Sequence, residues 1–253
     1  MSGNQLSLHG KVALLTGGSR GLGRATALGF ARAGADVAIA SRKLPDLETV
    51  AQEIRELGRK SLAVAAHVGK VDEIGNLVNT VQNEFGRIDI LVNNAGTNPT
   101  MAPAIDIEER AWDAIMNLNL KGLFFLSQAV ARLMKDRGGG SIINVASVAG
   151  FRPGGLPVYS ISKAGVIMAT KVMAKEWGPF NIRVNAIAPG LLKTRFSEAL
   201  WNRPEVEAGA ASMIPMKRLG VAEDIVGTML YLASDASAYV TGAIVVADGG
   251  QSL

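Results

Sequence analysis

Short apolar segments alternate with longer segments of helical periodicity along the whole chain, and this alternation constrains the fold more than any other feature. The predicted strands are residues 11–16, 36–40, 61–68, 88–92, 141–146, 183–188 and 243–246. The predicted helices are residues 22–33, 45–57, 71–85, 108–135 and 158–177. Strands that are apolar throughout and separated by helices are typical of a parallel sheet covered on both faces.

The order of these elements predicts an α/β fold without an internal domain boundary. Seven strands in this order indicate a doubly wound Rossmann-type arrangement, in which a seven-stranded parallel sheet is flanked by helices. No linker rich in Pro, Ser or charge divides the 253 residues, so we expect residues 1–253 to form one domain. Its cofactor half is expected at about 8–150 and its catalytic and substrate half at about 141–253. The irregular stretch 191–220 is interpreted as an inserted lid.

The composition excludes several classes of site. The absence of cysteine excludes disulfides and thiolate catalysis. His9 and His67 lie far apart without ligand spacing, so no metal site is expected. The net charge is +4 and the basic residues are scattered among acids, so no nucleic-acid partner is expected. Neither a signal peptide nor an apolar run of about 18–20 residues is visible, which predicts a cytoplasmic protein without membrane association.

A glycine-rich turn directly follows the first predicted strand and precedes the first predicted helix. Glycine lets the backbone adopt an unusual φ and approach a pyrophosphate, and the helix N-terminus presents free N–H groups to it. The turn therefore predicts a dinucleotide site, with a purely structural turn as the alternative. Its candidate contact residues are Gly17, Ser19, Arg20, Gly21, Leu22 and Gly23.

The residues after the second predicted strand favour NADP(H) over NAD(H). A carboxylate at this position usually holds the ribose 2′-hydroxyl of NAD, but this chain has Ser41, Arg42 and Lys43. A guanidinium binds phosphate oxygens in a bidentate fork, so Arg42 and Arg20 are candidates to hold the 2′-phosphate. Alternatively, Arg42 and Lys43 form a solvated strand end.

A tyrosine and a lysine lie one helical turn apart at the start of the predicted helix 158–177. Side chains at i and i+4 share a helix face, so Tyr159 and Lys163 can converge on one site. A nearby ammonium favours the phenolate, and we expect it to lower the pKa of Tyr159 toward the range of general acid–base catalysis. Ser147 follows the strand 141–146, where it can hydrogen-bond a substrate oxygen.

These motifs occur together in an order that resembles the short-chain dehydrogenase/reductase family. The variant glycine turn, the sequence Asn-Asn-Ala-Gly at 93–96, Ser147 and the pair Tyr159 and Lys163 all match that family. The resemblance covers nearly the whole chain and implies hydride transfer between a nicotinamide cofactor and a carbonyl or alcohol. It also implies that Asn119 completes a catalytic tetrad and holds a water that links the lysine to solvent.

The resemblance further implies which residues contact the cofactor. Family members flank the adenosine with the segment that corresponds to 93–96, although Asn93 itself has either a direct role or that of a turn residue. His67 departs from the pattern, because many members have Asp beside the adenine. The implied contacts beyond the glycine turn are Ser41, Arg42, Lys43, His67, Val68, Asn94, Ala95, Gly96, Tyr159, Lys163, Pro189, Gly190, Leu192 and Thr194.

Within the family, the sequence at 41–43, 67–70, 98–99 and 189–194 resembles NADP-dependent carbonyl reductases related to animal NADP-retinol dehydrogenase/reductase. This resemblance implies a ketone reductase. Apolar lid residues suit a small-molecule substrate with a hydrophobic body, or they simply pack the lid against the domain. They are Phe196, Leu200, Trp201, Met213, Ile214 and Met216. Further pocket candidates are Phe151, Arg152 and Leu156.

Two other functions remain open, and the resemblance also implies an oligomeric state. A 3-oxoacyl-[acyl-carrier-protein] reductase needs a basic docking surface, for which Arg132, Lys135 and Arg137 are candidates. A catalytically silent dinucleotide sensor would use the same fold, but such proteins typically lose the tyrosine or the lysine. The helices 108–135 and 158–177 match those through which family members form dimer contacts, so we expect a homotetramer.

Overall fold

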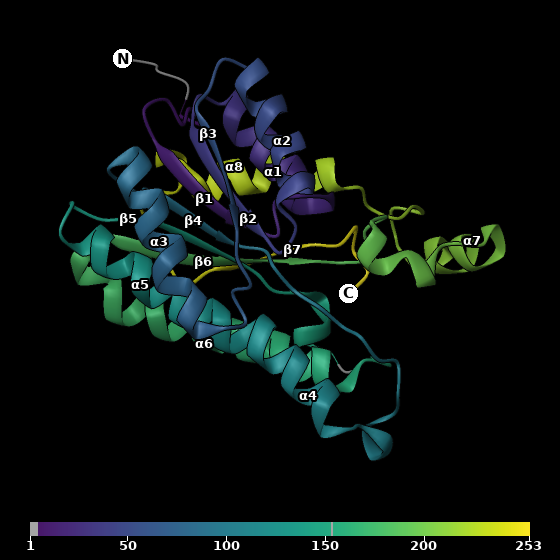
Figure 1. Ribbon diagram of the computed structural model, residues 1–253. Coiled ribbons are helices and arrows are strands. Elements are labelled where there is room, and N and C mark those ends of the chain that lie inside the picture. Colours follow the sequence, from purple (N-terminus) through teal and green to yellow (C-terminus); the bar gives the residue numbers. More distant parts are fainter. Residues whose placement is uncertain (1–4, 153) are drawn as a thin grey trace.

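One parallel sheet of seven strands forms the centre of the computed structural model, which describes residues 5–152 and 154–253 apart from the side chains of residues 199 and 200 (Figure 1). Its strands are β1 (Val12–Thr16), β2 (Asp36–Ser41), β3 (Ser61–Ala65), β4 (Ile90–Asn93), β5 (Gly140–Val145), β6 (Ile182–Pro189) and β7 (Ile244–Ala247). They lie in the order β3-β2-β1-β4-β5-β6-β7. The predicted seven-stranded parallel sheet is confirmed.

Helices cover both faces of the sheet, and each face has its own hydrophobic core. The helices are α1 (Gly21–Arg32), α2 (Leu44–Glu56), α3 (Val71–Phe85), α4 (Glu109–Met116), α5 (Leu123–Lys135), α6 (Pro157–Trp177), α7 (Pro204–Ser212) and α8 (Ala222–Ala233). In Figure 1, α1, α2 and α8 lie on one side of the sheet, and α3, α5 and α6 lie on the other. Successive strand residues point to opposite faces, so Leu14 enters one core and Leu15 the other.

The predicted helix 108–135 is interrupted by a wider turn. A π-helical turn, Asn117–Gly122, separates α4 from α5 without ending the helical path. Gly122 belongs to this turn, and a Cβ placed on it would collide with the backbone carbonyl oxygen of Val68. Apolar spacing cannot reveal such a turn, because a single π turn adds one residue without breaking the helix.

The segment 191–220, predicted to be irregular, contains two helical elements. A 3₁₀ helix, Arg195–Leu200, is followed by α7, which projects away from the sheet in Figure 1. None of the described residues of α7 is buried. The helix therefore has no apolar stripe that a periodicity argument could detect. We keep the name lid for residues 191–220.

Helix α8 was not predicted, although its sequence carries a usable signal. Ile225, Met229 and Leu232 are buried and lie at helical spacing. They pack in the same core as α1, where a Cβ on Gly29 would collide with Val226. Helix α8 thus covers, together with α1 and α2, one face of the sheet.

The strand order places the cofactor motifs at one point of the sheet. Strand β1 lies between β2 and β4, so the chain changes direction across the sheet at β1. In open α/β sheets, ligands bind outside the carboxyl ends of the strands at this switch point. The glycine turn after β1 and the segment after β4 are neighbours there. No helix in the described ranges is long and apolar enough to cross a bilayer.

Candidate active site

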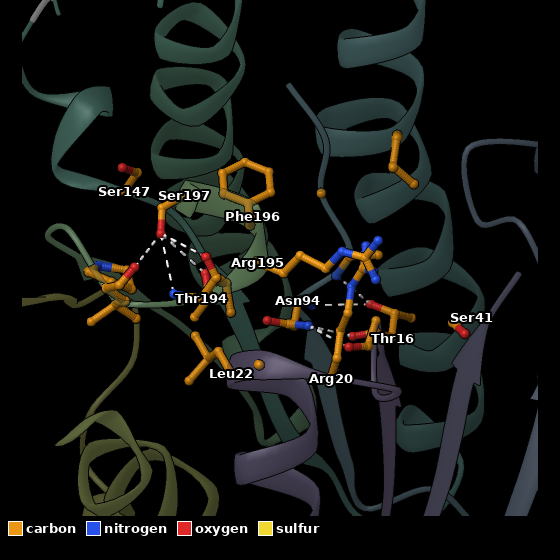
Figure 2. Close-up of a pocket in the computed structure, with 18 of the residues that line it drawn as sticks. Thr16, Arg20, Leu22, Ser41, Asn94, Ser147, Thr194, Arg195, Phe196 and Ser197 are labelled. Carbon is orange, nitrogen blue, oxygen red and sulfur yellow. Dashed lines mark hydrogen bonds between the residues drawn. The ribbon is translucent and has the colours of Figure 1, made fainter. Parts of the chain in front are cut away.

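A cavity of about 570 Å³ opens at the carboxyl ends of the strands. Figure 2 shows Ser147 and Phe196 toward one end of it and Arg20 and Ser41 toward the other. The predicted cofactor residues that line it are Gly17, Ser19, Arg20, Gly21, Leu22, Ser41, Arg42, Lys43, His67, Val68, Asn94, Ala95, Gly96, Tyr159, Lys163, Pro189, Gly190, Leu192 and Thr194. Of the other predicted site residues, Ser147 lines the cavity, whereas Gly23 and Asn119 lie behind its wall.

Hydrogen bonds with the segment after β4 fix the conformation of the glycine turn. The side-chain amide of Asn94 donates to the carbonyl oxygens of Thr16 (2.9 Å) and Gly17 (3.1 Å). In return, the Thr16 hydroxyl accepts hydrogen bonds from the backbone N–H groups of Asn94 and Ala95, both at 3.1 Å. A Cβ on Gly17 would lie 2.6 Å from the Asn94 amide, and one on Gly23 would collide with the Gly17 carbonyl. Gly23 therefore supports the turn instead of touching the cavity.

The first turn of α1 presents its backbone N–H groups without a competing acid. Arg20 is the N-cap residue and provides no side-chain cap, and no acidic residue lies in the first turn. Gly21 adopts a positive φ of 52° at the start of the helix. Uncapped N–H groups and the positive end of the helix dipole suit an anion such as a pyrophosphate.

The end of the cavity near the carboxyl end of β2 is basic. Arg20, Arg42 and Lys43 line it, and their side chains form no ion pair or hydrogen bond with any residue the structure describes. Asp46 is the acid that lines this region, and the sequence analysis did not single it out. Free cations at the end of β2 fit the 2′-phosphate of NADP(H), which a carboxylate would repel.

His67 and Val68 line the cavity, and the local contacts of His67 are structural. The ring Nδ1 of His67 accepts a hydrogen bond from the N–H of Gly69 at 3.1 Å. The backbone N–H of His67 donates to the carboxylate of Glu73 at 2.7 Å, which lowers the pKa of that carboxyl group. The imidazole is thereby held in place beside the cavity, and Val68 adds a buried apolar surface.

Asn93 lies in the interior of the sheet and does not reach the cavity. Its buried amide donates to the Ser127 hydroxyl at 2.8 Å and to the Asn144 carbonyl oxygen at 2.9 Å. Asn144 in turn donates to the Thr170 hydroxyl at 2.9 Å. This network joins β4 and β5 to α5 and α6. The geometry therefore supports a structural role for Asn93 and not a direct cofactor contact.

Tyr159, Lys163 and Ser147 line the cavity together, and Figure 2 shows Ser147 at the end away from Ser41. Tyr159 and Lys163 lie one turn apart on α6, and the ammonium is 5.6 Å from the centroid of the phenol ring. Lys163 is buried and donates to the carbonyl oxygen of Val145 at 2.7 Å. The Ser147 hydroxyl accepts from the N–H of Ala149 at 3.2 Å, which fixes its direction after β5.

Burial shifts both ionisable groups of this site toward their neutral forms. Burial lowers the pKa of the Lys163 ammonium from 10.5 to about 8. Burial also raises the pKa of the Tyr159 phenol, and the hydrogen bond with Ser147 only partly opposes this. The predicted lowering of the Tyr159 pKa is therefore wrong for the free chain. Loss of water around the phenol has the larger effect on its pKa.

Asn119 lies in the π-helical turn, close to Gly96 and Lys163. Its carboxamide oxygen accepts from the N–H of Thr97 at 2.8 Å, and its amide donates to the Thr97 carbonyl at 3.0 Å and to Ser162 at 3.1 Å. A Cβ on Gly96 would lie 3.5 Å from the Asn119 carboxamide oxygen and 3.8 Å from the Lys163 ammonium. The Asn119 carboxamide and the Lys163 ammonium therefore both lie beside Gly96.

Phe196 is a lid residue that contacts Tyr159. Its ring centroid lies 5.8 Å from that of Tyr159, with the ring planes at 42°. Leu156 also lines the cavity, whereas Phe151 and Arg152 are exposed outside it. The apolar wall beside the tyrosine is therefore built from the lid and from the segment before α6.

The other apolar lid residues point elsewhere. Ile214 is buried at the base of the lid, and the Trp201 indole N–H donates to the Ser197 hydroxyl at 3.0 Å. Met213 and Met216 are 74% and 63% exposed, so neither packs the lid against the domain. The side chain of Leu200 lies outside the part of the chain that the structure describes.

Several residues that line the cavity were not predicted from the sequence, among them Arg195 and Gln251. Gln251 comes from the end of the chain, and its carboxamide oxygen accepts a hydrogen bond from the N–H of Leu191 at 3.1 Å. A Cβ on Gly190 would lie 2.7 Å from that oxygen. No local motif connects residues 190–191 with 251, so only the fold reveals this contact. Arg195 could have been noticed, since it directly follows Thr194.

Comparison with known proteins supports one family along the whole chain. A family model described as "Enoyl-(Acyl carrier protein) reductase" matches residues 17–252. The chain is 44% identical to 2-dehydro-3-deoxy-D-gluconate 5-dehydrogenase of Escherichia coli (strain K12), with 96% of each chain covered. It is 40% identical to Dehydrogenase/reductase SDR family member 4 of Oryctolagus cuniculus, with 96% of this chain and 94% of the relative covered.

Two further relatives widen the range of substrates and show a cofactor. The 3-oxoacyl-[acyl-carrier-protein] reductase FabG of Thermotoga maritima is 42% identical, with 97% of this chain and 99% of the relative covered. The crystal structure of a gluconate 5-dehydrogenase from Burkholderia cenocepacia J2315 in complex with NADP and tartrate is 34% identical. It superposes with a TM-score of 0.94 over 98% of this chain and 97% of that one. The fold, the site and these relatives show that the chain belongs to the short-chain dehydrogenase/reductase family.

Proposed function

We propose that this protein transfers a hydride between NADP(H) and a carbonyl or secondary alcohol. One observation carries the proposal: Tyr159, Lys163 and Ser147 lie at one end of the cavity that the glycine turn and the basic strand end also line. The relatives are dehydrogenases and reductases, and a similar solved structure contains NADP. A silent sensor is disfavoured, because nothing is missing from the catalytic group.

The proposed mechanism assigns each step to a residue of this chain. The bound cofactor supplies or accepts the hydride. Ser147 hydrogen-bonds the substrate oxygen, and Tyr159 donates its proton to that oxygen as negative charge develops on it. The raised pKa of Tyr159 keeps the phenol protonated in the free chain, as an acid in reduction must be. Lys163 stabilises the resulting phenolate and holds the nicotinamide ribose, and Asn119 holds the water that resupplies the proton.

Two classes of free small-molecule substrate have support. An apolar wall formed by Phe196 and Leu156 supports a ketone with a hydrophobic body, the substrate of a carbonyl reductase. The identity to 2-dehydro-3-deoxy-D-gluconate 5-dehydrogenase and the tartrate complex of a gluconate 5-dehydrogenase favour a hydroxy or keto sugar acid as the second candidate. Parallel assays of apolar ketones and keto sugar acids distinguish them by kcat/KM.

A substrate bound to acyl carrier protein has support from the FabG relative but not from the proposed docking residues. Helix α5 ends at Lys135, just before β5 begins, so Arg132, Lys135 and Arg137 lie at the amino ends of the strands. The cavity lies at the carboxyl ends. Lys135 is also engaged, since its ammonium lies 4.3 Å from the ring centroid of Phe180.

The proposed assembly is a homotetramer. Large apolar side chains are exposed on α4, α5 and α6, where the helices would meet a second copy: Trp112, Phe125, Ile161, Met168 and Val172. Exposed apolar surface of this kind marks interaction sites in soluble proteins. Static light scattering at micromolar concentration tests the assembly, and a monomer would contradict it.

The decisive experiment compares the wild type with Tyr159→Phe. This exchange preserves shape but removes the proton donor, so kcat for NADPH-dependent reduction should fall by roughly 10²–10⁴-fold. The dissociation constant for NADPH, measured by its fluorescence, should stay within a few-fold of the wild type. Near-normal turnover by a variant that binds NADPH would refute the assignment of Tyr159. Failure of the wild type to bind NADPH would refute the proposed function itself.

A further inference from the structure

Arg195 is a free cation on the wall of the cavity. It begins the 3₁₀ helix after Thr194, and among the described lid residues it is the basic one that lines the cavity. Its side chain forms no ion pair or hydrogen bond with any residue in the described ranges. Lys193, two residues earlier, differs in this respect: it forms an ion pair with Glu207 and lies 5.9 Å from the ring centroid of Trp201. The free cation of this part of the lid is therefore Arg195.

The Arg195 side chain extends toward the dinucleotide end of the cavity and away from Ser147. Figure 2 shows it crossing from the lid toward the side on which Arg20 rises from the glycine turn. At its base, a methyl group of Thr194 would lie 3.5 Å from a Cβ on Gly21, the first residue of α1. Two guanidinium groups that enter one cavity from opposite walls repel each other unless an anion lies between them.

We propose that Arg195 binds the pyrophosphate of the dinucleotide from the lid side and thereby holds the lid in place over the cofactor; this inference rests on the proposed function. The pyrophosphate is the anion expected at the start of α1, which Thr194 faces. A guanidinium can hold its oxygens in bidentate geometry. Because Phe196 is the next residue and contacts Tyr159, a fixed Arg195 also holds the apolar wall against Tyr159. Cofactor binding thus stabilises the substrate pocket.

The test uses the dissociation constants of NADPH and NADH for Arg195→Gln, with Lys193→Gln as the matched control. Both cofactors contain the pyrophosphate, so Arg195→Gln should weaken both by the same factor, about tenfold or more. ADP-ribose, which lacks the nicotinamide, should lose affinity equally. Lys193→Gln removes a lid cation that is already paired and should change none of these constants. Arg42→Gln should weaken NADPH alone.

Hydrogen exchange of residues 204–212 reports, separately from affinity, on how firmly the bound cofactor holds the lid. Saturating NADPH should slow exchange there in the wild type and in Lys193→Gln, but not in Arg195→Gln. Unchanged dissociation constants for Arg195→Gln would overturn the proposal. A loss confined to NADPH would place Arg195 at the 2′-phosphate, and a rise confined to the KM of acidic substrates would place it at a substrate carboxylate. Either result also overturns it. A wild type that binds neither cofactor would instead refute the proposed function.

Discussion

Replacing Lys163 with Met tests how much the buried ammonium of the site lowers the free energy of unfolding. The pKa of Lys163 falls from 10.5 to about 8 on burial, which corresponds to about 3 kcal/mol at about 1.4 kcal/mol for each pH unit. Between these two pKa values the unfolded chain binds a proton that the native chain has released, so wild-type stability rises with pH across this window. Below pH 8 the lysine is charged in both the native and the unfolded chain, so burial of the ammonium destabilises the native state by the full amount.

The assay is urea unfolding of both proteins at about pH 7 and about pH 10, at equal protein concentration. The Met variant also loses the hydrogen bond to the Val145 carbonyl, but that loss is the same at both pH values. The stability of Lys163→Met relative to the wild type should therefore be about 2–3 kcal/mol greater at pH 7 than at pH 10. Lys171→Met, an exposed position on the same helix, is the control and should show no such difference. A difference independent of pH, or one of opposite sign, would refute the reasoning.

Three further predictions concern the cofactor and the lid. Ser41→Asp with Arg42→Ile should reverse a preference for NADPH over NADH of tenfold or more, since a charged hydrogen bond contributes about 1.5–3 kcal/mol; a wild type that prefers NADH in equilibrium binding speaks against the assigned cofactor. Gly23→Ala should abolish dinucleotide binding, because the new methyl group collides with the Gly17 carbonyl. An unchanged NADPH dissociation constant would show that the turn can yield. Phe196→Ala should raise the KM of bulky apolar ketones several-fold more than that of acetone, and equal effects would remove Phe196 from the substrate pocket.

The sheet could be predicted because each strand is a continuous apolar run that ends at a turn or cap signal. The cofactor turn was equally visible, because glycine spacing is local in sequence. Helix α7 could not be found in this way, since it buries none of its described residues. The roles of the site residues, the division into two functional halves and the cytoplasmic location stay predictions.

Properties that depend on burial were the least accessible from sequence. The i, i+4 spacing places Tyr159 and Lys163 on one helix face, but it does not report how much water each retains. Desolvation therefore reversed the expected direction of the Tyr159 shift. Likewise, the contact between Leu191 and Gln251 joins positions that are adjacent only after β6 and β7 have paired.

The π-helical turn Asn117–Gly122 makes the site sensitive to chain length in a way that side-chain substitutions do not test. Each residue of an α-helix rotates the chain by about 100° and advances it by about 1.5 Å. Deleting one residue of this turn after Asn119 would close the wide turn into a regular helix and preserve the helical content. It would also rotate α4 relative to α5 by that angle and turn its exposed Trp112 to a different side. Such a deletion should look harmless in circular dichroism, yet it would separate the carboxamide behind Lys163 from Thr97.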